Sequence, residues 1–194
     1  MFFSTPTVQR LSLYLSLLML TQCSKCKTDP TPADPTSQLP PATQTGADTF
    51  GCLLNGRPWT PRGNAGVPNY VVTYDPSYHG GNLDIRTYNV IANTGKPQFL
   101  GFGGDHINQV GTYSFITPPN FPTPGPRNVY FSDVSKSAPC NDYSYNPGTT
   151  TSGELVITRL DAKLGIISGT FHFTLAQPGC DTLRFTQGRF DKTL

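Results

Sequence analysis

Residues 153–191 read GELVITRLDAKLGIISGTFHFTLAQPGCDTLRFTQGRFD, and this stretch decides the fold. From Ile167 to Leu175, apolar residues and glycine alternate with Ser, Thr and His. This is the period of a strand with one buried and one solvated face. The segment 154–160 alternates in the same way before the turn DAKLG, and 182–186 follows the turn QPGCD. The pattern predicts three antiparallel strands in a β-meander.

A meander with one apolar face needs a second layer, which the upstream chain must supply. Further strands are predicted at 70–74, 82–90, 98–102, 111–115 and 128–133, at the spacing of a sandwich or barrel. The expected fold class is therefore all-β. It is an antiparallel β-sandwich or partly open barrel that ends in the three-stranded meander, after a signal peptide and a Pro-rich tether.

The folded part begins with a predicted hairpin around Asn55-Gly56. Asn-Gly favours a type I′ turn, in which both central residues have positive φ. Trp59, the single tryptophan, follows in the second arm. We interpret it as a core residue because of the area that a Trp side chain buries. A sugar-stacking platform is the alternative interpretation.

Charge and composition limit the classes of partner. The chain has 194 residues, with 14 Lys and Arg against 12 Asp and Glu, so it is close to neutral. It offers no electrostatic reason to bind nucleic acid. Charged residues make up only 13%, while Gly and Pro number 19 each, which is typical of a loop-rich β protein.

The N-terminus indicates export. A single positive charge, Arg10, precedes an apolar run at 11–20, which is too short to span a bilayer and fits a signal-peptide core. The sequence Leu20-Thr21-Gln22-Cys23 resembles the lipobox of bacterial lipoproteins, which implies cleavage before Cys23 and lipidation of its thiol. Gln22 stands where that motif usually has a small residue. An ordinary secreted protein, cleaved elsewhere, is the alternative.

Three segments follow from this reading. Residues 1–22 are the predicted lipoprotein signal peptide, 23–47 a Pro/Thr-rich tether and 48–194 a single β domain. The tether carries almost no apolar side chains, and its prolines favour extended polyproline conformations. About 145 residues remain for the domain, which is near the commonest domain size.

Several short sequences carry a resemblance to a known group of proteins. They are FGCLLNGRPWTP at 50–61, ITRLD at 157–161, IISGTFHF at 166–173 and QGRFD at 187–191. The two ends of the domain resemble Bacteroidetes-type cell-envelope lipoproteins whose β-rich domain has no assigned function. The resemblance implies a lipid-anchored protein of the outer membrane, facing the periplasm or the cell surface. It carries over no catalytic residues and no cofactor.

The cysteines agree with export into an oxidising compartment. Cys140 lies in the long connection before the meander and Cys180 in its second turn, so we predict a disulfide between them. Cys52 is then a buried free thiol, or the partner in a competing pairing. No C-x-x-C pair lies inside the domain, and no metal site is predicted.

Catalytic motifs are missing from the sequence. It contains no G-x-S-x-G elbow, no H-E-x-x-H, no P-loop and no dinucleotide fingerprint. Asp105-His106 is the one dipeptide with chemical promise, although a solvated loop is the favoured interpretation. A hydrolase of unfamiliar type would need at least two of Asp75, His79, Asp105 and His106 to converge in one cleft.

Aromatic residues in loops suggest a different function. Tyr78, Phe121, Tyr143 and Tyr145 occur among Asn and Gly, a mixture that grips sugars or peptides by stacking and neutral hydrogen bonds. Loops that merely close the ends of the sandwich are the alternative. The sequence therefore favours a non-catalytic, lipid-anchored envelope protein that binds a glycan or another protein. An envelope hydrolase with a site around Asp105 and His106 is the second hypothesis.

Overall fold

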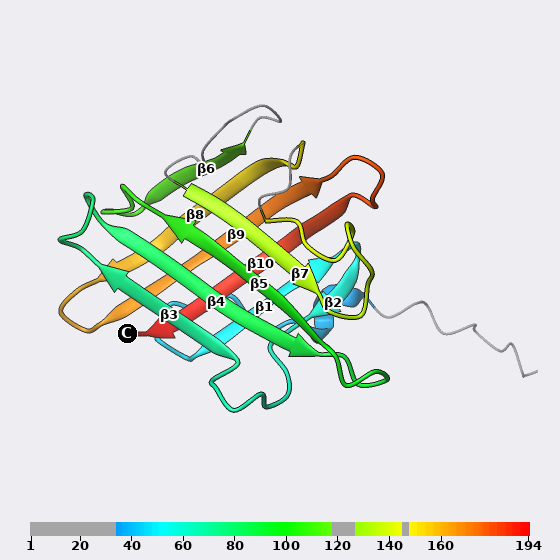
Figure 1. Cartoon of the computed structure of the whole chain (residues 1–194). Helices are drawn as coiled ribbons and strands as arrows, with labels where there is room; N and C mark the ends of the chain where they lie inside the picture. Colours follow the sequence, from blue (N-terminus) through cyan, green and yellow to red (C-terminus); the bar gives the residue numbers. More distant parts are fainter. Residues whose placement is uncertain (1–33, 118–126, 145–147) are drawn as a thin grey trace, which may run out of the picture. The chain divides into compact units, whose positions relative to one another are not determined.

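Two antiparallel β-sheets pack face to face in the computed structural model, which describes residues 34–117, 127–144 and 148–194 (Figure 1). The strands in these ranges are β1 (Thr49–Leu54), β2 (Arg57–Trp59), β3 (Tyr70–Asp75), β4 (Asn82–Val90), β5 (Pro97–Gly104), β6 (Gly111–Thr117), β7 (Arg127–Asp133), β8 (Thr150–Asp161), β9 (Ile166–Ala176) and β10 (Leu183–Thr193). One sheet has the order β2-β1-β10-β9-β8-β6 and the other the order β3-β4-β5-β7. The structure is thus an all-β sandwich of two separate sheets, rather than a partly open barrel.

The predicted meander forms the centre of the larger sheet. β9 pairs with β8 on one side and with β10 on the other, both antiparallel. β10 is longer than its sequence pattern predicted, because it continues to Thr193 and pairs with β1. The first hairpin therefore joins the same sheet as the meander.

The first hairpin has the predicted turn. Asn55 has φ of 48° and Gly56 has φ of 78°, as a type I′ turn requires. Trp59 is only 4% exposed, and its indole Nε1 donates to Gln98 Oε1 at 2.9 Å. The core interpretation of this tryptophan is confirmed.

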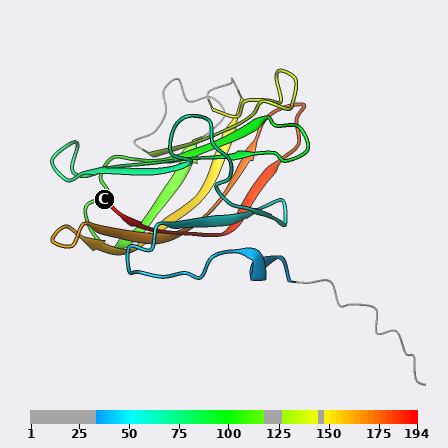
Figure 2. The same ribbon diagram turned by 90° about the horizontal axis from the view of Figure 1, so that it is seen from below.

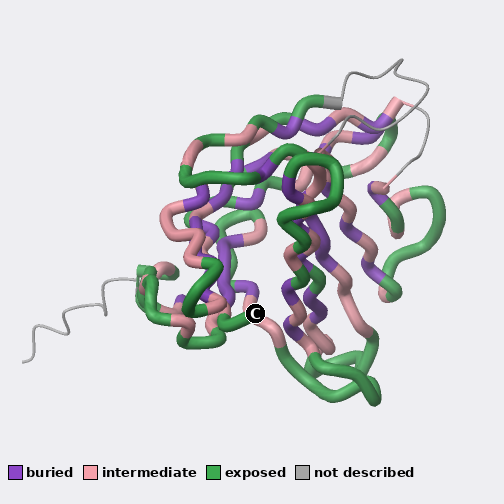
Figure 3. The backbone as a smooth tube through the Cα atoms, turned by 90° about the vertical axis from the view of Figure 1, so that its left-hand side faces the viewer, coloured by how far each residue is buried: buried purple, intermediate pink, exposed green. Residues whose placement is uncertain are grey.

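Buried residues lie along the strands of both sheets (Figure 3), and phenylalanine rings contribute much of the core between them. Phe102 of the smaller sheet lies 4.5 Å from Phe171 of β9, and Phe50 of β1 lies 5.3 Å from Phe171, between ring centroids. Phe171 and Phe173 are buried while His172 between them is exposed, as the alternation predicted.

A strap, defined here as residues 34–48, runs along the outer face of the larger sheet (Figure 2). It contains one turn of 3₁₀ helix, η2 (Pro35–Gln38), and buries Leu39. The compact unit therefore begins at Asp34, so the second half of the predicted tether is part of the domain rather than a free linker. The predicted signal peptide, Cys23 and the first half of the tether lie outside the described residues.

A buried carboxylate, Asp191 on β10, fixes the strap. It accepts hydrogen bonds from Thr43 Oγ1 (2.7 Å) and from the backbone N–H groups of Thr45 (2.9 Å), Gly46 (2.8 Å) and Ala47 (3.1 Å). Ser168 Oγ on the neighbouring strand donates to it at 2.6 Å. Ser168 belongs to the solvated face in the sequence pattern, yet it is fully buried because the strap covers it.

Candidate functional site

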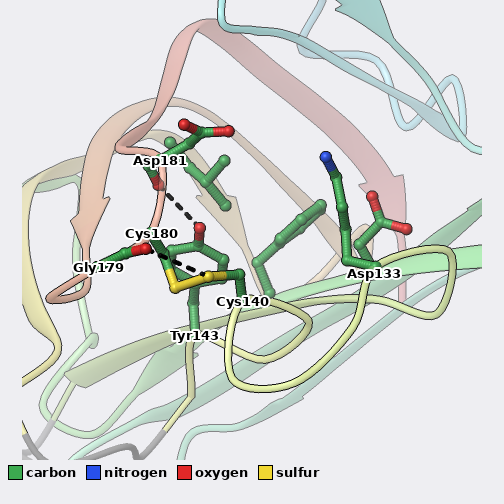
Figure 4. Close-up of a pocket in the computed structure, with 9 residues that line it drawn as sticks. Asp133, Cys140, Tyr143, Gly179, Cys180 and Asp181 are labelled. Atoms are coloured by element: carbon green, nitrogen blue, oxygen red, sulfur yellow. Dashed lines mark hydrogen bonds between the residues drawn. A yellow bond between two sulfur atoms is a disulfide. The ribbon is translucent and has the colours of Figure 1, made fainter.

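The predicted disulfide joins two loops at one end of the sandwich. Cys140 in the β7–β8 connection is bonded to Cys180 in the β9–β10 turn, with Cα atoms 5.4 Å apart (Figure 4). Among the cysteines that the structure describes, Cys52 is the free one, and it is buried. Burial raises the pKa of its thiol, so it is held in the neutral form.

A polar chain anchors the start of the β7–β8 connection. The buried carboxylate of Asp133 accepts from Ser135 N (2.9 Å) and Ser135 Oγ (2.5 Å) at one oxygen and from Gln98 Nε2 (2.7 Å) at the other. Gln98 in turn accepts from the Trp59 indole. The first hairpin, β5 and the disulfide-bonded loop are therefore held together by side chains that all have partners.

These segments enclose a cleft, named here the disulfide cleft, of about 600 Å³. Its walls are the first hairpin, the β4–β5 turn, the β7–β8 loop and the β9–β10 turn. It is lined by Leu54, Asn55, Arg57, Pro58, Trp59, Asn89, Ile91, Ala92, Gln98, Phe131, Asp133, Lys136, Asp181 and Leu183. A smaller pocket of about 170 Å³ beside the disulfide shares Phe131, Asp133, Lys136, Asp181 and Leu183 with it (Figure 4).

Besides the buried Asp133, three charged side chains line the cleft from different segments: Arg57, Lys136 and Asp181. All three residues are exposed. Within the described part of the chain, none of these side chains has an ion-pair partner. Their hydrogen-bonding capacity is therefore open to a ligand, unlike that of Asp133.

The four aromatic residues predicted to bind a ligand do not form one group. Tyr143 is 3% exposed, packs against Phe131 and donates its hydroxyl to the Asp181 carbonyl at 2.8 Å. Tyr143 therefore has a structural role. It lies in the β7–β8 connection, which the disulfide joins to the β9–β10 turn. Tyr78 is 53% exposed but lies in the β3–β4 turn, at the opposite end of β4 from the cleft residue Asn89. Phe121 and Tyr145 lie outside the described residues.

Three of the four predicted polar residues do meet, near Tyr78. The group formed by His79, Asp105 and His106 is named here the histidine cluster. Asp105 Oδ2 lies 2.9 Å from His79 Nδ1, and Asn82 Nδ2 donates to Asp105 Oδ1 at 2.7 Å. The hydrogen bonds from Asn82 and His79 lower the pKa of Asp105, which keeps it ionised.

Asp75, the fourth residue, takes no part in the cluster. Its Oδ1 accepts from Ser77 N (2.8 Å), Ser77 Oγ (2.7 Å) and Tyr78 N (3.2 Å), which closes the β3–β4 turn. Hydrogen bonds from the Ser77 side chain and backbone lower its pKa. The role of Asp75 is therefore to shape the turn that presents Tyr78 and His79.

Comparison with protein-family models, with curated proteins and with solved structures gave no match to this chain. In the described residues, no helix has the length and apolar character needed to cross a membrane.

Proposed function

We propose that the chain is a lipid-anchored cell-envelope protein that binds a glycan, without catalysis, through the disulfide cleft. The observation that carries this proposal is the cleft itself. It has a volume in the range of small-ligand sites, and a disulfide and a satisfied polar chain hold its walls in place. Unpaired Arg57, Lys136 and Asp181 at its rim supply hydrogen bonds to hydroxyl groups.

A glycan suits the surface better than a protein partner does. A protein interface generally needs a contiguous patch with an apolar centre. The large exposed hydrophobic residues that the structure describes are dispersed over separate turns and strand ends: Val67, Tyr78, Val110, Ile116, Val134, Leu164 and Leu194. The cleft, by contrast, is lined by polar groups together with parts of Leu54, Phe131 and Leu183.

Ligand binding can be followed by the fluorescence of Trp59, the single tryptophan, because it lines the cleft. We expect a glycan-array screen to give a ligand whose titration changes Trp59 fluorescence. Arg57→Ala and Lys136→Ala should each weaken its affinity at least tenfold, since a hydrogen bond to a charged group contributes about 1.5–3 kcal/mol and every 1.4 kcal/mol is about tenfold in affinity. Lys163→Ala, in the β8–β9 turn, is the matched control and should bind normally. If no glycan binds, or if all variants bind with equal affinity, the proposal that the disulfide cleft binds a glycan is wrong.

The anchor part of the proposal rests on Cys23 and the lipobox-like sequence before it. Wild-type protein should partition with the outer membrane and carry palmitate, and Cys23→Ser should release it into the soluble fraction. Cys26→Ser, three residues away, is the control and should stay in the membrane. A wild-type protein that is already soluble would show that the chain is secreted without a lipid.

A hydrolase centred on the histidine cluster is the second candidate function. Because an ionised Asp105 can only accept, its contact with His79 Nδ1 at 2.9 Å favours the neutral tautomer with the proton on Nδ1, which would leave Nε2 free as a general base. Ser77, the hydroxyl two residues before His79, is engaged by Asp75 and is therefore not poised as a nucleophile. Equal hydrolysis of a chromogenic ester by wild type and His79→Ala would rule this candidate out.

A further inference from the structure

We propose that the outer face of the larger sheet carries a second binding site, centred on Arg189, for the carboxylate group of an acidic glycan. The site is a groove of about 590 Å³ over β8, β9 and β10, named here the sheet groove. Its lining includes Ala42, Thr170, His172, Thr186, Gln187 and Arg189. It shares no lining residue with the disulfide cleft, so either proposal can fail without the other.

A β-bulge in β10 contributes two polar side chains to the groove. The register of β10 against β9 shifts between Phe185 and Gly188. Thr186 and Gln187 therefore stand opposite His172 alone, and all three are exposed. Gln187 has φ of 53°, a backbone conformation that is uncommon for a residue other than glycine. Bulges of this kind redirect side chains and are frequent beside functional sites.

Arg189 supplies the positive charge of the groove. It lies between Thr170 of β9 and Gly51 of β1 in the sheet. Its Nε donates to the Gln187 carbonyl at 3.2 Å, and its Nη1 donates to the Pro40 carbonyl of the strap at 3.4 Å. These bonds hold the guanidinium between the bulge and the strap. Within the described part of the chain Arg189 has no ion-pair partner, so its remaining N–H groups are available to a ligand.

A glycine lets the strap approach Arg189. A Cβ added at Gly51 would lie 2.7 Å from Pro40 Cδ, so a side chain there would push the strap away from the sheet. Ala42, two residues further along the strap, lines the groove. The strap, which Asp191 fixes, therefore helps to form the groove as well as covering the sheet.

The groups that line the groove predict an anionic ligand with hydroxyl groups. No acidic residue of the described chain is part of the lining. Arg189 and the His172 ring can donate, and the hydroxyl groups of Thr170 and Thr186 can donate or accept. Glu154 stands opposite His172 on β8, on the side away from β10. A guanidinium binds a carboxylate through charge-assisted hydrogen bonds, while the neutral groups suit the hydroxyls of a sugar ring.

A glycan suits the groove better than an acidic peptide does. An extended peptide commonly binds by adding a strand to a free sheet edge. The groove lies over β8, β9 and β10, each of which already pairs with a neighbour on both sides. Recognition must therefore come from side chains, and the volume of about 590 Å³ is in the range of small-ligand sites.

Calorimetric titration of the full chain with trigalacturonate tests the site. The fully methyl-esterified trisaccharide is the matched neutral ligand. We expect the acid to bind and the ester to bind at least about tenfold more weakly, because charge-assisted hydrogen bonds are about twice as strong as neutral ones. The NMR signals of Thr170, His172 and Gln187 should shift. The fluorescence of Trp59 should not change, because Trp59 does not line the groove.

Matched variants locate the binding site. Arg189→Gln removes the charge but keeps an N–H donor for the backbone carbonyls, and it should weaken binding at least about tenfold. His172→Ala, at an exposed position, should weaken binding about threefold. Arg184→Ala removes another exposed arginine of β10 that does not line the groove, and it should bind normally. Arg57→Ala, in the disulfide cleft, should also bind normally.

Circular dichroism checks that each variant is folded. The proposal is wrong if trigalacturonate does not bind, or if Arg189→Gln binds it as tightly as wild type does. A loss of binding in Arg57→Ala instead would place the ligand in the disulfide cleft. Equal affinity for sodium sulfate would indicate a site for any anion, and tighter binding of poly-glutamate would indicate a peptide site. Each of these three results overturns the acidic-glycan site.

Discussion

Asp191 shows how one residue can decide the course of a distant segment. Burial by itself would raise the pKa of its carboxyl group, but hydrogen bonds from Ser168 and Thr43 and from the backbone of Thr45 and Ala47 outweigh this. The pKa of Asp191 consequently lies far below its ordinary value. The strap therefore depends on the ionised carboxylate, since only that form accepts all of these donors.

Replacing Asp191 by Asn should lower the free energy of unfolding by about 2–4 kcal/mol, because hydrogen bonds to a charged group contribute about 1.5–3 kcal/mol each. The depressed pKa adds a pH dependence. The contribution of ionised Asp191 to the free energy of unfolding is fully present above its unfolded-state pKa of about 3.9. It is lost as the pH falls toward its folded-state pKa. Chemical denaturation at pH 7 and pH 3 should show that wild type loses stability on acidification and that Asp191→Asn loses less.

Asp84→Asn is a suitable control for the charge change. Asp84 pairs with Arg86 at 2.8 Å on the surface of β4, where exposed ion pairs contribute about 0–1 kcal/mol. Increased proteolysis between residues 34 and 48 in Asp191→Asn alone would locate the damage in the strap. Equal effects of the two substitutions would mean that the strap does not depend on Asp191.

At the scale of elements, the meander is defined by residues that alternate across β9. Phe171 is buried between the two sheets, and a Cβ added at Gly188 of β10 would lie 2.5 Å from its ring. The glycine on the neighbouring strand thus provides the space that the phenylalanine ring fills. His172 points to the other face and makes no comparable contact in the described structure.

Phe171→Ala should destabilise the domain by about 3–5 kcal/mol, the usual range for a large core side chain replaced by Ala. His172→Ala should change the stability by less than about 0.5 kcal/mol. Thermal and urea denaturation of the two single variants measures the difference. If both variants lose similarly little stability, Phe171 does not lie in the core and the assignment of the two faces of β9 is wrong.

The sequence alone predicts the elements whose pattern is formed by residues close together in the chain. The alternation in β9, the Asn55-Gly56 turn and the burial of Trp59 each follow from a few neighbouring residues. The docking of the strap could not be predicted, because its Pro/Thr-rich composition is that of a free linker. Its partner, Asp191, lies 146 residues beyond Thr45.

For the whole molecule, the same limit applies to the candidate sites. Arg57 at the start of β2, Lys136 in the β7–β8 loop and Asp181 in the β9–β10 turn share no motif, and only the sandwich topology brings them to one end. The polar neighbours of Tyr143 predict a contact with ligand, but its ring is buried against Phe131 and its hydroxyl donates to the Asp181 carbonyl. The histidine cluster was partly predictable, since Asp105-His106 is a local dipeptide, whereas its pairing with His79 depends on two turns meeting.

The disulfide connects the stability of the whole molecule to the shape of its cleft. It closes a loop with a sequence separation of 40. Reducing it, or introducing Cys140→Ser with Cys180→Ser, should lower the free energy of unfolding by about 4 kcal/mol in the loop-entropy model. The glycan affinity of the cleft should also fall, because Lys136 and Asp181 lie on the two segments that the bond joins.

Urea denaturation with and without dithiothreitol measures the loss, and the double variant should no longer respond to the reductant. In a Cys23→Ser, Cys26→Ser background, Cys52 should react with a thiol probe only on unfolding, because it is buried in β1. Peptide mapping without reduction should recover Cys140 and Cys180 in one linked pair. A linked Cys52 would contradict this pairing, since Cys52 is a free thiol buried in β1 and the bond joins Cys140 to Cys180.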